Sequence, residues 1–178
     1  GSVNSTNIFR DNPNMNKHSC TEGRNGSVAM CVSSSTSCNV NNNGVTPIAF
    51  EFVINPENGF DLAFSKLVFH QKAPENYAWI AGNSGPNNYP TRYQIRVLKN
   101  NVEIYTLSDI PTSLTWHEEL YNFIGNEAFI AKNSTTFRIE LFPYCAVGNT
   151  SMVSAWDIDD VEVYTACIND GSRKKKKK

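Results

Sequence analysis

Apolar and polar side chains alternate with a period of two along most of the chain that follows residue 45. The clearest case is the segment 92–97, in which Tyr93, Ile95 and Val97 alternate with three polar residues. This period is that of a β-strand with one buried face and one solvated face. The same pattern predicts further strands at 27–32, 48–54, 62–70, 102–107, 137–141 and 156–165.

Turn residues separate these expected strands. Asn100 and Asn101 lie between strands expected at 92–99 and 102–107, and an Asn-Asn pair tolerates the positive φ angles of a two-residue hairpin turn. Two other segments, 116–123 and 126–132, are expected as short helices.

Seven or more short strands with turns between them predict an all-β fold, an antiparallel two-sheet β-sandwich of the jelly-roll type. We assign the sandwich to residues 45–170. Residues 1–44 are expected to form a polar, cysteine-containing segment that packs on the sandwich. Residues 171–178 are typical of an engineered linker and basic tag.

The composition indicates an extracellular β-protein with an acidic surface. Asn, Ser and Thr account for 51 of the 178 residues, which is typical of secreted β-proteins. The formal net charge is −1, but residues 171–178 hold six of the sixteen basic residues and none of the seventeen acidic ones, so the rest carries −7. An acidic domain does not suit nucleic acid, and no apolar run approaches the roughly 20 residues that cross a bilayer. We expect neither nucleic-acid binding nor membrane insertion.

Five cysteines occur, without the paired spacing of a zinc site. We expect one disulfide among Cys20, Cys31 and Cys38, and a second one involving Cys145 and Cys167. One cysteine is then left as a thiol or as a partner for a neighbouring domain. Because disulfides persist in oxidising compartments, the cysteines predict a secreted or cell-surface protein.

Two parts of the sequence carry a resemblance to known modules. The first part comprises residues 50–62 and 66–69. It contains a strand, then a Pro/Gly turn and then a second strand that ends in an aromatic residue. Residues 137–142 and 156–163 are similar to a closing pair of strands, the latter containing Ile-Asp-Asp-Val. The chain thereby resembles jelly-roll modules of bacterial secreted surface proteins, carbohydrate-binding modules and MAM-type adhesion domains. The resemblance spans roughly residues 45–167 and implies the same sandwich fold.

Asp157, Asp159 and Asp160 form the densest group of carboxylates. Hard oxygen ligands suit Ca²⁺, and the resemblance implies a structural calcium ion near this closing strand. Asp11 or Glu22 from the polar opening would complete its ligands. Alternatively, Asp157 and Asp159 cap loop backbone while Asp160 faces solvent.

Sugar recognition needs flat aromatic faces flanked by amides and charged groups. The loop 71–90 and the strand that follows it contain such residues, and the expected ligand-binding set is Trp79, Asn87, Asn88, Tyr89, Arg92, Gln94 and Arg96. Trp79 and Tyr89 would stack on sugar rings. The three polar residues of the strand share one face and would contact hydroxyl groups. The alternative is an ordinary solvated sheet face, with Trp79 packed within its loop.

Catalysis has the least support in the sequence, which lacks a nucleophile elbow, a phosphate loop and a dinucleotide fingerprint. Glu51 and Glu140 occupy outward-facing strand positions and are the pair to test for a glycan-degrading jelly-roll enzyme. We expect a non-catalytic module that binds a polysaccharide or a cell-surface glycan. The alternative is an adhesion or structural module that contacts another protein, neighbouring domains of a larger surface protein or its own repeats.

Overall fold

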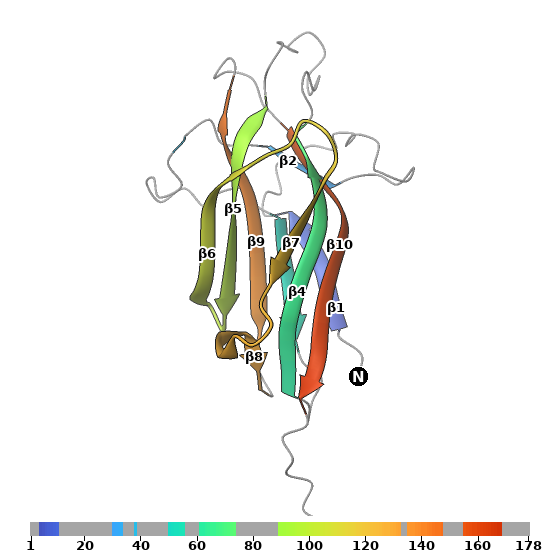
Figure 1. Cartoon of the computed structure of the whole chain (residues 1–178), viewed down its shortest axis with the longest axis vertical. Helices are drawn as coiled ribbons and strands as arrows, with labels where there is room; N and C mark the ends of the chain where they lie inside the picture. The colour runs from blue at the N-terminus through green and yellow to red at the C-terminus, as the bar shows by residue number, and fades with distance from the viewer. Residues whose placement is uncertain are drawn as a thin grey trace, which may run out of the picture.

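Two antiparallel sheets make up the protein. The computed structural model describes residues 4–10, 30–33, 38, 50–55, 61–73, 89–132, 135–147 and 155–168. The first sheet has the order β1-β3-β9-β5-β6, and the second has the order β2-β10-β4-β7 (Figure 1). The first contains β1 Asn4–Arg10, β3 Phe50–Asn55, β9 Phe137–Ala146, β5 Pro90–Lys99 and β6 Val102–Pro111. The second contains β2 Met30–Ser33, β10 Ala155–Ile168, β4 Asp61–Lys72 and β7 His117–Asn122, and β8 Ile130–Ala131 pairs with β4.

The chain crosses between the sheets repeatedly, as in a jelly roll. It passes from β3 to β4, from β4 to β5, from β6 to β7 and from β9 to β10, and each of these steps changes sheet. The long axes of both sheets run together along the molecule, with one sheet in front of the other (Figure 1). The predicted two-sheet antiparallel sandwich is therefore confirmed.

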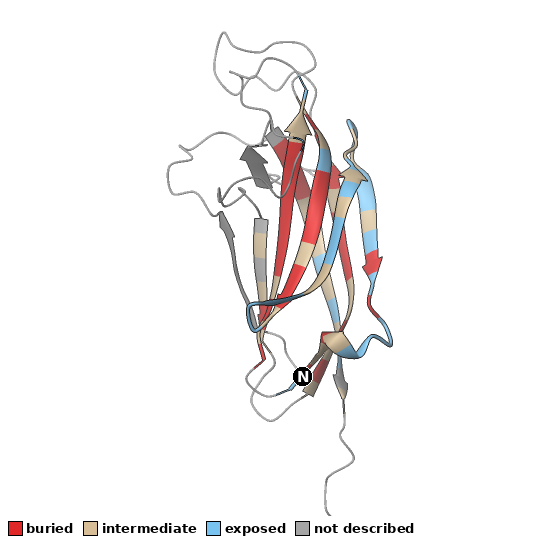
Figure 2. Cartoon of the chain, turned by 90° about the vertical axis from the view of Figure 1, so that its left-hand side faces the viewer, coloured by how far each residue is buried: buried red, intermediate tan, exposed pale blue. Residues whose placement is uncertain are grey.

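The core lies between the two sheets and is rich in aromatic rings. Tyr93, Ile95 and Val97 of β5 are fully buried, as their alternation predicts. The Tyr93 ring meets Phe69 of β4 and Trp156 of β10, and the rings of Tyr93 and Trp156 stack with centroids 4.9 Å apart. Figure 2 shows buried positions along the central strands and exposed positions on strands at one side of the molecule.

The β5–β6 hairpin turns at the two asparagines predicted from the sequence. Asn100 and Asn101 have φ angles of 49° and 65°, both in the left-handed region. The Asn100 side chain also accepts a hydrogen bond from the backbone N–H of Thr136, at 2.8 Å. This bond ties the turn to the segment that enters β9.

The two predicted helices are corrected by the structure. The segment 116–123 contains strand β7, which pairs with β4 and places Tyr121 in the core. The segment 126–132 contains one 3₁₀ turn at Glu127–Phe129, followed by β8. In both cases strand pairing with β4 supplies backbone hydrogen bonds that a short isolated helix would not replace. The strand β1 was not predicted from its polar sequence.

The second predicted disulfide is also wrong. Cys145 is bonded to Cys38 and not to Cys167. The bond joins one cysteine from each of the two groups that the sequence suggested, across a separation of 107 residues. Cys20 lies outside the described residues, so the expected bridge within the first group stays a prediction.

No helix in the part of the chain that the structure describes is long and apolar enough to cross a membrane.

Candidate functional site

Arg92, Gln94 and Arg96 share the outer face of the first sheet, as predicted, but their surroundings differ. Gln94 is buried and donates a hydrogen bond to Ser108 Oγ on β6 at 2.5 Å. Arg96 is half-buried and donates from Nε to Glu140 Oε2 on β9 at 2.6 Å. Arg92 is exposed. The three side chains therefore range from a buried packing residue to a surface guanidinium.

A row of alternating charges crosses this outer face from β3 to β5. Glu51 and Glu140 are direct cross-strand neighbours, and Arg96 also faces Glu140. Arg138 Nε lies 3.1 Å from Glu140 Oε1 and 3.9 Å from Glu51 Oε2. Each carboxylate is thus next to a guanidinium, which offsets the repulsion between two acids placed opposite each other. The arrangement explains how Glu140 is accommodated at 7% exposure.

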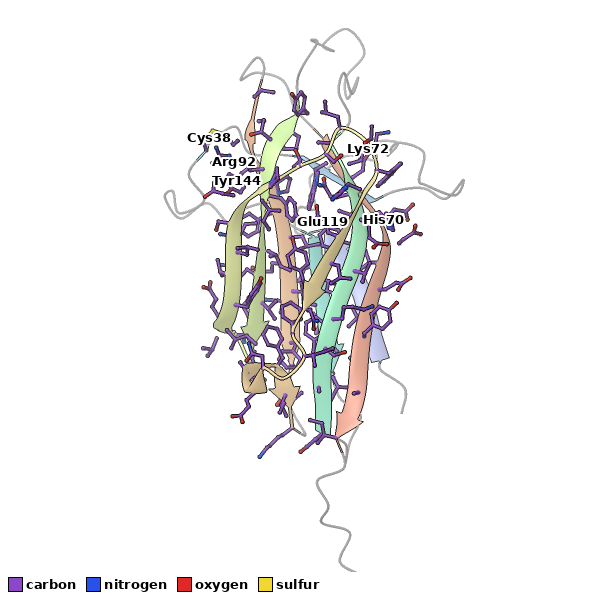
Figure 3. The ribbon with its side chains drawn as sticks, viewed as in Figure 1. Cys38, His70, Lys72, Arg92, Glu119 and Tyr144 are labelled. Carbon is purple, nitrogen blue, oxygen red and sulfur yellow. A yellow bond between two sulfur atoms is a disulfide. The ribbon has the colours of Figure 1, made fainter. Side chains whose placement is uncertain are left out.

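A polar site at the end of this face consists of the exposed residues Arg92 and Asp109 and the buried Tyr144, and we call it the Arg92 cluster. Arg92 Nη1 donates to Asp109 Oδ1 at 2.6 Å, and Tyr144 Oη donates to the same oxygen at 3.0 Å. The backbone N–H of Asp109 donates back to Tyr144 Oη at 2.6 Å. The side chains of Arg92 and Asp109 are 48% and 62% exposed. Figure 3 shows Arg92 and Tyr144 beside Cys38 at one end of the sandwich.

The backbone around the Arg92 cluster is constrained. Asp109 has a φ of 60° and Cys145, next to Tyr144, has a φ of 56°. Non-glycine residues in this region carry strain and concentrate at functional sites. The Cys38–Cys145 disulfide and the hydrogen bond from Thr91 Oγ1 to the Cys145 carbonyl, at 2.8 Å, restrain the second of these positions.

Two groups of the Arg92 cluster, the Asp109 carboxyl and the Tyr144 phenol, have shifted pKa values. The hydrogen bond from Arg92, and then that from Tyr144, lowers the pKa of the Asp109 carboxyl. Burial is the largest cause that raises the pKa of the Tyr144 phenol. At neutral pH the cluster therefore presents a carboxylate, a guanidinium and a neutral hydroxyl.

Of the other predicted ligand-binding residues, one is too buried to offer its whole ring to a ligand, and three lie outside the described part of the chain. Tyr89 is half-buried and packs against the core. Trp79, Asn87 and Asn88 lie outside the described residues. Binding of a ligand at any of the seven predicted residues stays a prediction.

The three aspartates predicted to bind calcium lie on β10. Asp157 is buried, and Asp159 and Asp160 are half-buried. Asp160 has a φ of 49°, at a point where the register between β10 and β4 shifts, and its backbone N–H donates to Asp159 Oδ1 at 2.9 Å. Within the described residues, no three His, Cys, Asp or Glu side chains come together in a way that could hold a metal ion. Asp11 and Glu22 are outside those residues, so calcium binding stays a prediction.

The outer face of the second sheet carries a second polar group, which sequence reasoning missed. His70 on β4 lies between Glu118 on β7, 3.6 Å from Nε2, and Asp160 on β10, 3.8 Å from Nδ1. Lys72 Nζ lies 5.7 Å from the centre of the Trp116 ring. Spacing along the chain did not reveal this group, because its members come from three strands.

Asp109 and Tyr144 were also missed by the sequence analysis. Tyr144 follows a proline at the end of β9, and Asp109 lies in β6 two residues before Pro111. The signal that could have found them is the register, since Arg92 pairs with Pro111 on one side and Tyr144 on the other.

Comparison with known proteins assigns no family. No protein-family model matches the chain, and no curated protein matches it. Similar solved structures include the Stig cyclase FisC from Fischerella sp. TAU, in complex with an indole compound, at 8% identity and a TM-score of 0.41, covering 85% of this chain and 82% of that one. The acetyl xylan esterase Est2A from Butyrivibrio proteoclasticus has 9% identity and a TM-score of 0.31, over 80% of this chain and 32% of that one. A family 35 carbohydrate-binding module from an environmental isolate has 14% identity and a TM-score of 0.23, over 89% and 98%. Scores this low assign no function.

Proposed function

We propose that this protein is a secreted, non-catalytic carbohydrate-binding module that contacts a polysaccharide or cell-surface glycan through the Arg92 cluster. The observation that carries the proposal is the exposed Arg92–Asp109 pair, held in place by the left-handed backbone of Asp109 and by the Tyr144 hydroxyl. A polar group that is both exposed and restrained suits ligand recognition, because little side-chain entropy is lost on binding.

The donors and acceptors of the cluster match the hydroxyl groups of a sugar. A guanidinium has five N–H donors, and only one of those of Arg92 bonds to Asp109. Asp109 accepts both of its side-chain bonds at Oδ1, which leaves Oδ2 without a partner among the described residues. Adjacent sugar hydroxyls can accept from the guanidinium and donate to this oxygen.

The segment that enters β5 would add the stacking surface. Tyr89 directly precedes Pro90 and lies three residues before Arg92, and Trp79, Asn87 and Asn88 precede it. In the proposal, Trp79 covers the apolar face of a sugar ring while the Arg92 cluster binds its hydroxyl edge. Aromatic stacking with polar flanks is the usual chemistry of such sites.

Affinity electrophoresis through gels that contain neutral polysaccharides tests the proposal. We expect one polymer class to retard the protein, and Asp109→Asn and Arg92→Ala to weaken the retardation about tenfold, as for loss of a charge-assisted hydrogen bond. Glu103→Gln is the matched control, because Glu103 is an exposed carboxylate at the opposite end of the same strand. If no polymer retards the wild-type protein, the proposal is wrong.

The absence of catalysis is part of the proposal and has its own test. Glu51 and Glu140 lie opposite each other on one face, and Glu140 is bound to Arg96 and Arg138. We expect no release of reducing sugar from any polymer that binds. Release that is lost in Glu140→Gln and retained in Glu103→Gln would replace the proposal with a glycan-degrading enzyme.

One observation favours the alternative of an adhesion or structural module. Val102 and Leu107 on β6 and Leu120 on β7 are 65%, 43% and 56% exposed, and both strands are sheet edges. Exposed edge strands offer backbone groups and apolar side chains to another chain. Self-association in sedimentation experiments, without any response to glycans, would favour this alternative.

A further inference from the structure

A cavity of about 330 Å³ lies at the end of β5 that is opposite the Arg92 cluster. It lies where the β5–β6 hairpin meets the 3₁₀ turn, β8 and the segment before β9, and its lining residues are Lys99, Glu127, Ile130, Lys132 and Thr135. The volume falls within the range of small-molecule sites. Two ammonium groups, one carboxylate and one hydroxyl are thus gathered around one hollow.

Lys99 is held rigidly at this cavity. Its Nζ donates to the carbonyl oxygens of Ala128 at 3.2 Å and Ile130 at 2.6 Å. An ammonium has three N–H donors, so one remains after these two bonds. The two carbonyls fix the position of the charge without neutralising it.

Lys132 is placed by a tight turn. Thr135 N donates to the Lys132 carbonyl at 2.9 Å, and Lys132 N donates to Thr135 Oγ1 at 3.2 Å. Thr135 is buried and Lys132 is exposed. Lys132 is thus the second lysine that lines the cavity, next to Thr135.

These two lysines differ from the described arginines in their partners. Arg92, Arg96 and Arg138 lie beside carboxylates, whereas Lys99 Nζ lies 5.9 Å from the centre of the Phe137 ring, as Lys66 and Lys72 lie over aromatic rings. Neither Lys99 nor Lys132 has a carboxylate within 4.0 Å among the described residues, although Glu127 lines the same cavity. With two lysines and one glutamate, the lining of the cavity carries a net positive charge, and this charge attracts an anion even in a domain that is acidic overall.

We propose that this cavity binds the carboxylate of a uronic acid sugar, with the carboxylate between Lys99 and Lys132. The inference rests on the proposed glycan-binding function and adds acidic sugar residues to the ligands of the protein. Glu127 and the Thr135 hydroxyl are the groups that would meet the sugar hydroxyls, and Ile130 offers an apolar surface to the ring. Glucuronate combines these features within one residue.

Residue-resolved NMR titration of the full chain tests this inference. Because the lysines of residues 174–178 also attract anions, the readout is the set of backbone amide shifts of Ile130, Lys132 and Thr135. The probes are D-glucuronate, D-glucose and acetate at equal concentration and constant ionic strength. We expect saturable shifts with glucuronate, none with glucose and weaker binding of acetate.

Variants locate the charge that is responsible. Lys132→Gln should weaken glucuronate binding about two- to fivefold, the range for one exposed charge pair. Lys66→Gln, the same change of charge on the second sheet, should leave it unchanged. We choose Lys132 and not Lys99 for substitution, because replacing Lys99 would remove two hydrogen bonds from the fold.

Three results would overturn the inference: shifts confined to residues 171–178, equal binding of glucose or acetate, or no effect of Lys132→Gln. Retardation by a neutral polysaccharide together with any of these results would leave the Arg92 cluster standing and remove only the uronate site. Glucuronate binding without retardation by any neutral polysaccharide would leave the uronate site standing and exclude polysaccharide binding at the Arg92 cluster.

Discussion

Gln71 shows how one buried polar side chain organises a whole end of the sandwich. It lies on the core-facing side of β4 and is fully buried. Its amide nitrogen donates to Glu119 Oε1 at 3.2 Å and to the Pro111 carbonyl at 3.5 Å. Its oxygen accepts from Ser113 N at 3.2 Å and from Trp156 Nε1 at 3.0 Å. Because all its polar atoms are satisfied, the residue connects β7, β10 and the crossover between the sheets.

Replacing Gln71 by leucine should therefore destabilise the protein strongly. Gln71→Leu keeps a side chain of similar size but makes it apolar, so it removes the oxygen that accepts from the Trp156 indole N–H and the Ser113 N–H. We expect a loss of about 2–4 kcal/mol in the free energy of unfolding, measured in urea. Gln94→Leu is the control, since it removes one hydrogen bond to Ser108 and should cost about 1 kcal/mol. Equal losses for both variants would contradict this account.

The two tyrosines of the core predict a loss of stability in alkali. The hydroxyls of Tyr93 and Tyr121 lie 2.6 Å apart, and burial is the largest cause that raises the pKa of both phenols above its usual value. The folded state thus favours the neutral phenols, while those of the unfolded chain ionise near pH 10. Their contribution is fully present below about pH 10 and is lost as the pH rises further.

The double variant Tyr93→Phe/Tyr121→Phe tests this linkage. Both partners of the hydrogen bond are removed together, so the stability at pH 8 should change little. Between about pH 10 and pH 11 the wild-type protein should lose about 2 kcal/mol more than the double variant, since each phenol contributes up to about 1.4 kcal/mol per pH unit. Urea unfolding curves at both pH values measure the difference. Parallel losses in the two proteins would exclude the tyrosine pair as their cause.

At the scale of elements, the hairpin of β5 and β6 is determined by local chemistry. The alternation in β5 decides which residues enter the core, and two left-handed asparagines set the register of β6. The strand β7 is the opposite case. Its residues alternate too, with Glu119 and Tyr121 directed inward, but Leu120 is exposed and no local signal separates this pattern from a helix. Only pairing with β4 decides that the segment is extended.

Substitutions at Asn101 test the role of the hairpin turn. Asn101 is exposed and has a φ of 65°, which β-branched residues rarely adopt. Asn101→Val should destabilise the protein by about 1–2 kcal/mol, whereas Asn101→Gly should stay within about 0.5 kcal/mol of the wild type. Thermal unfolding of the two variants gives the comparison. A valine variant as stable as the glycine variant would show that the turn adapts.

At the scale of the whole molecule, the Cys38–Cys145 disulfide connects the segment between β2 and β3 to the end of β9. The two cysteines are separated by 107 residues, so the bond closes a long loop in the unfolded chain. Long closed loops restrict the unfolded ensemble most. The same bond lies beside the Arg92 cluster, because Cys145 follows Tyr144 directly. Stability and the geometry of the candidate site are thus coupled.

Removing this disulfide should affect both properties. We expect Cys38→Ser/Cys145→Ser to lose about 2–5 kcal/mol in the free energy of unfolding under non-reducing conditions. Retardation by the polysaccharide that binds the wild type should weaken as well, because Cys145 is no longer restrained next to Tyr144. A variant of unchanged stability would mean that the unfolded chain gains little freedom from the loss of the bond.

The sequence by itself determined the architecture and the core strands, and the tertiary structure decided the sites. Period-two alternation is local, so Tyr93, Ile95, Val97 and the asparagine turn could be read directly. The partners of Arg92 could not, because Asp109 and Tyr144 reach it through the register of three strands. The disulfide partner of Cys145, the His70 group and the lysine cavity depend in the same way on contacts between distant segments. Spacing along a chain carries no information on such contacts until the strands are paired.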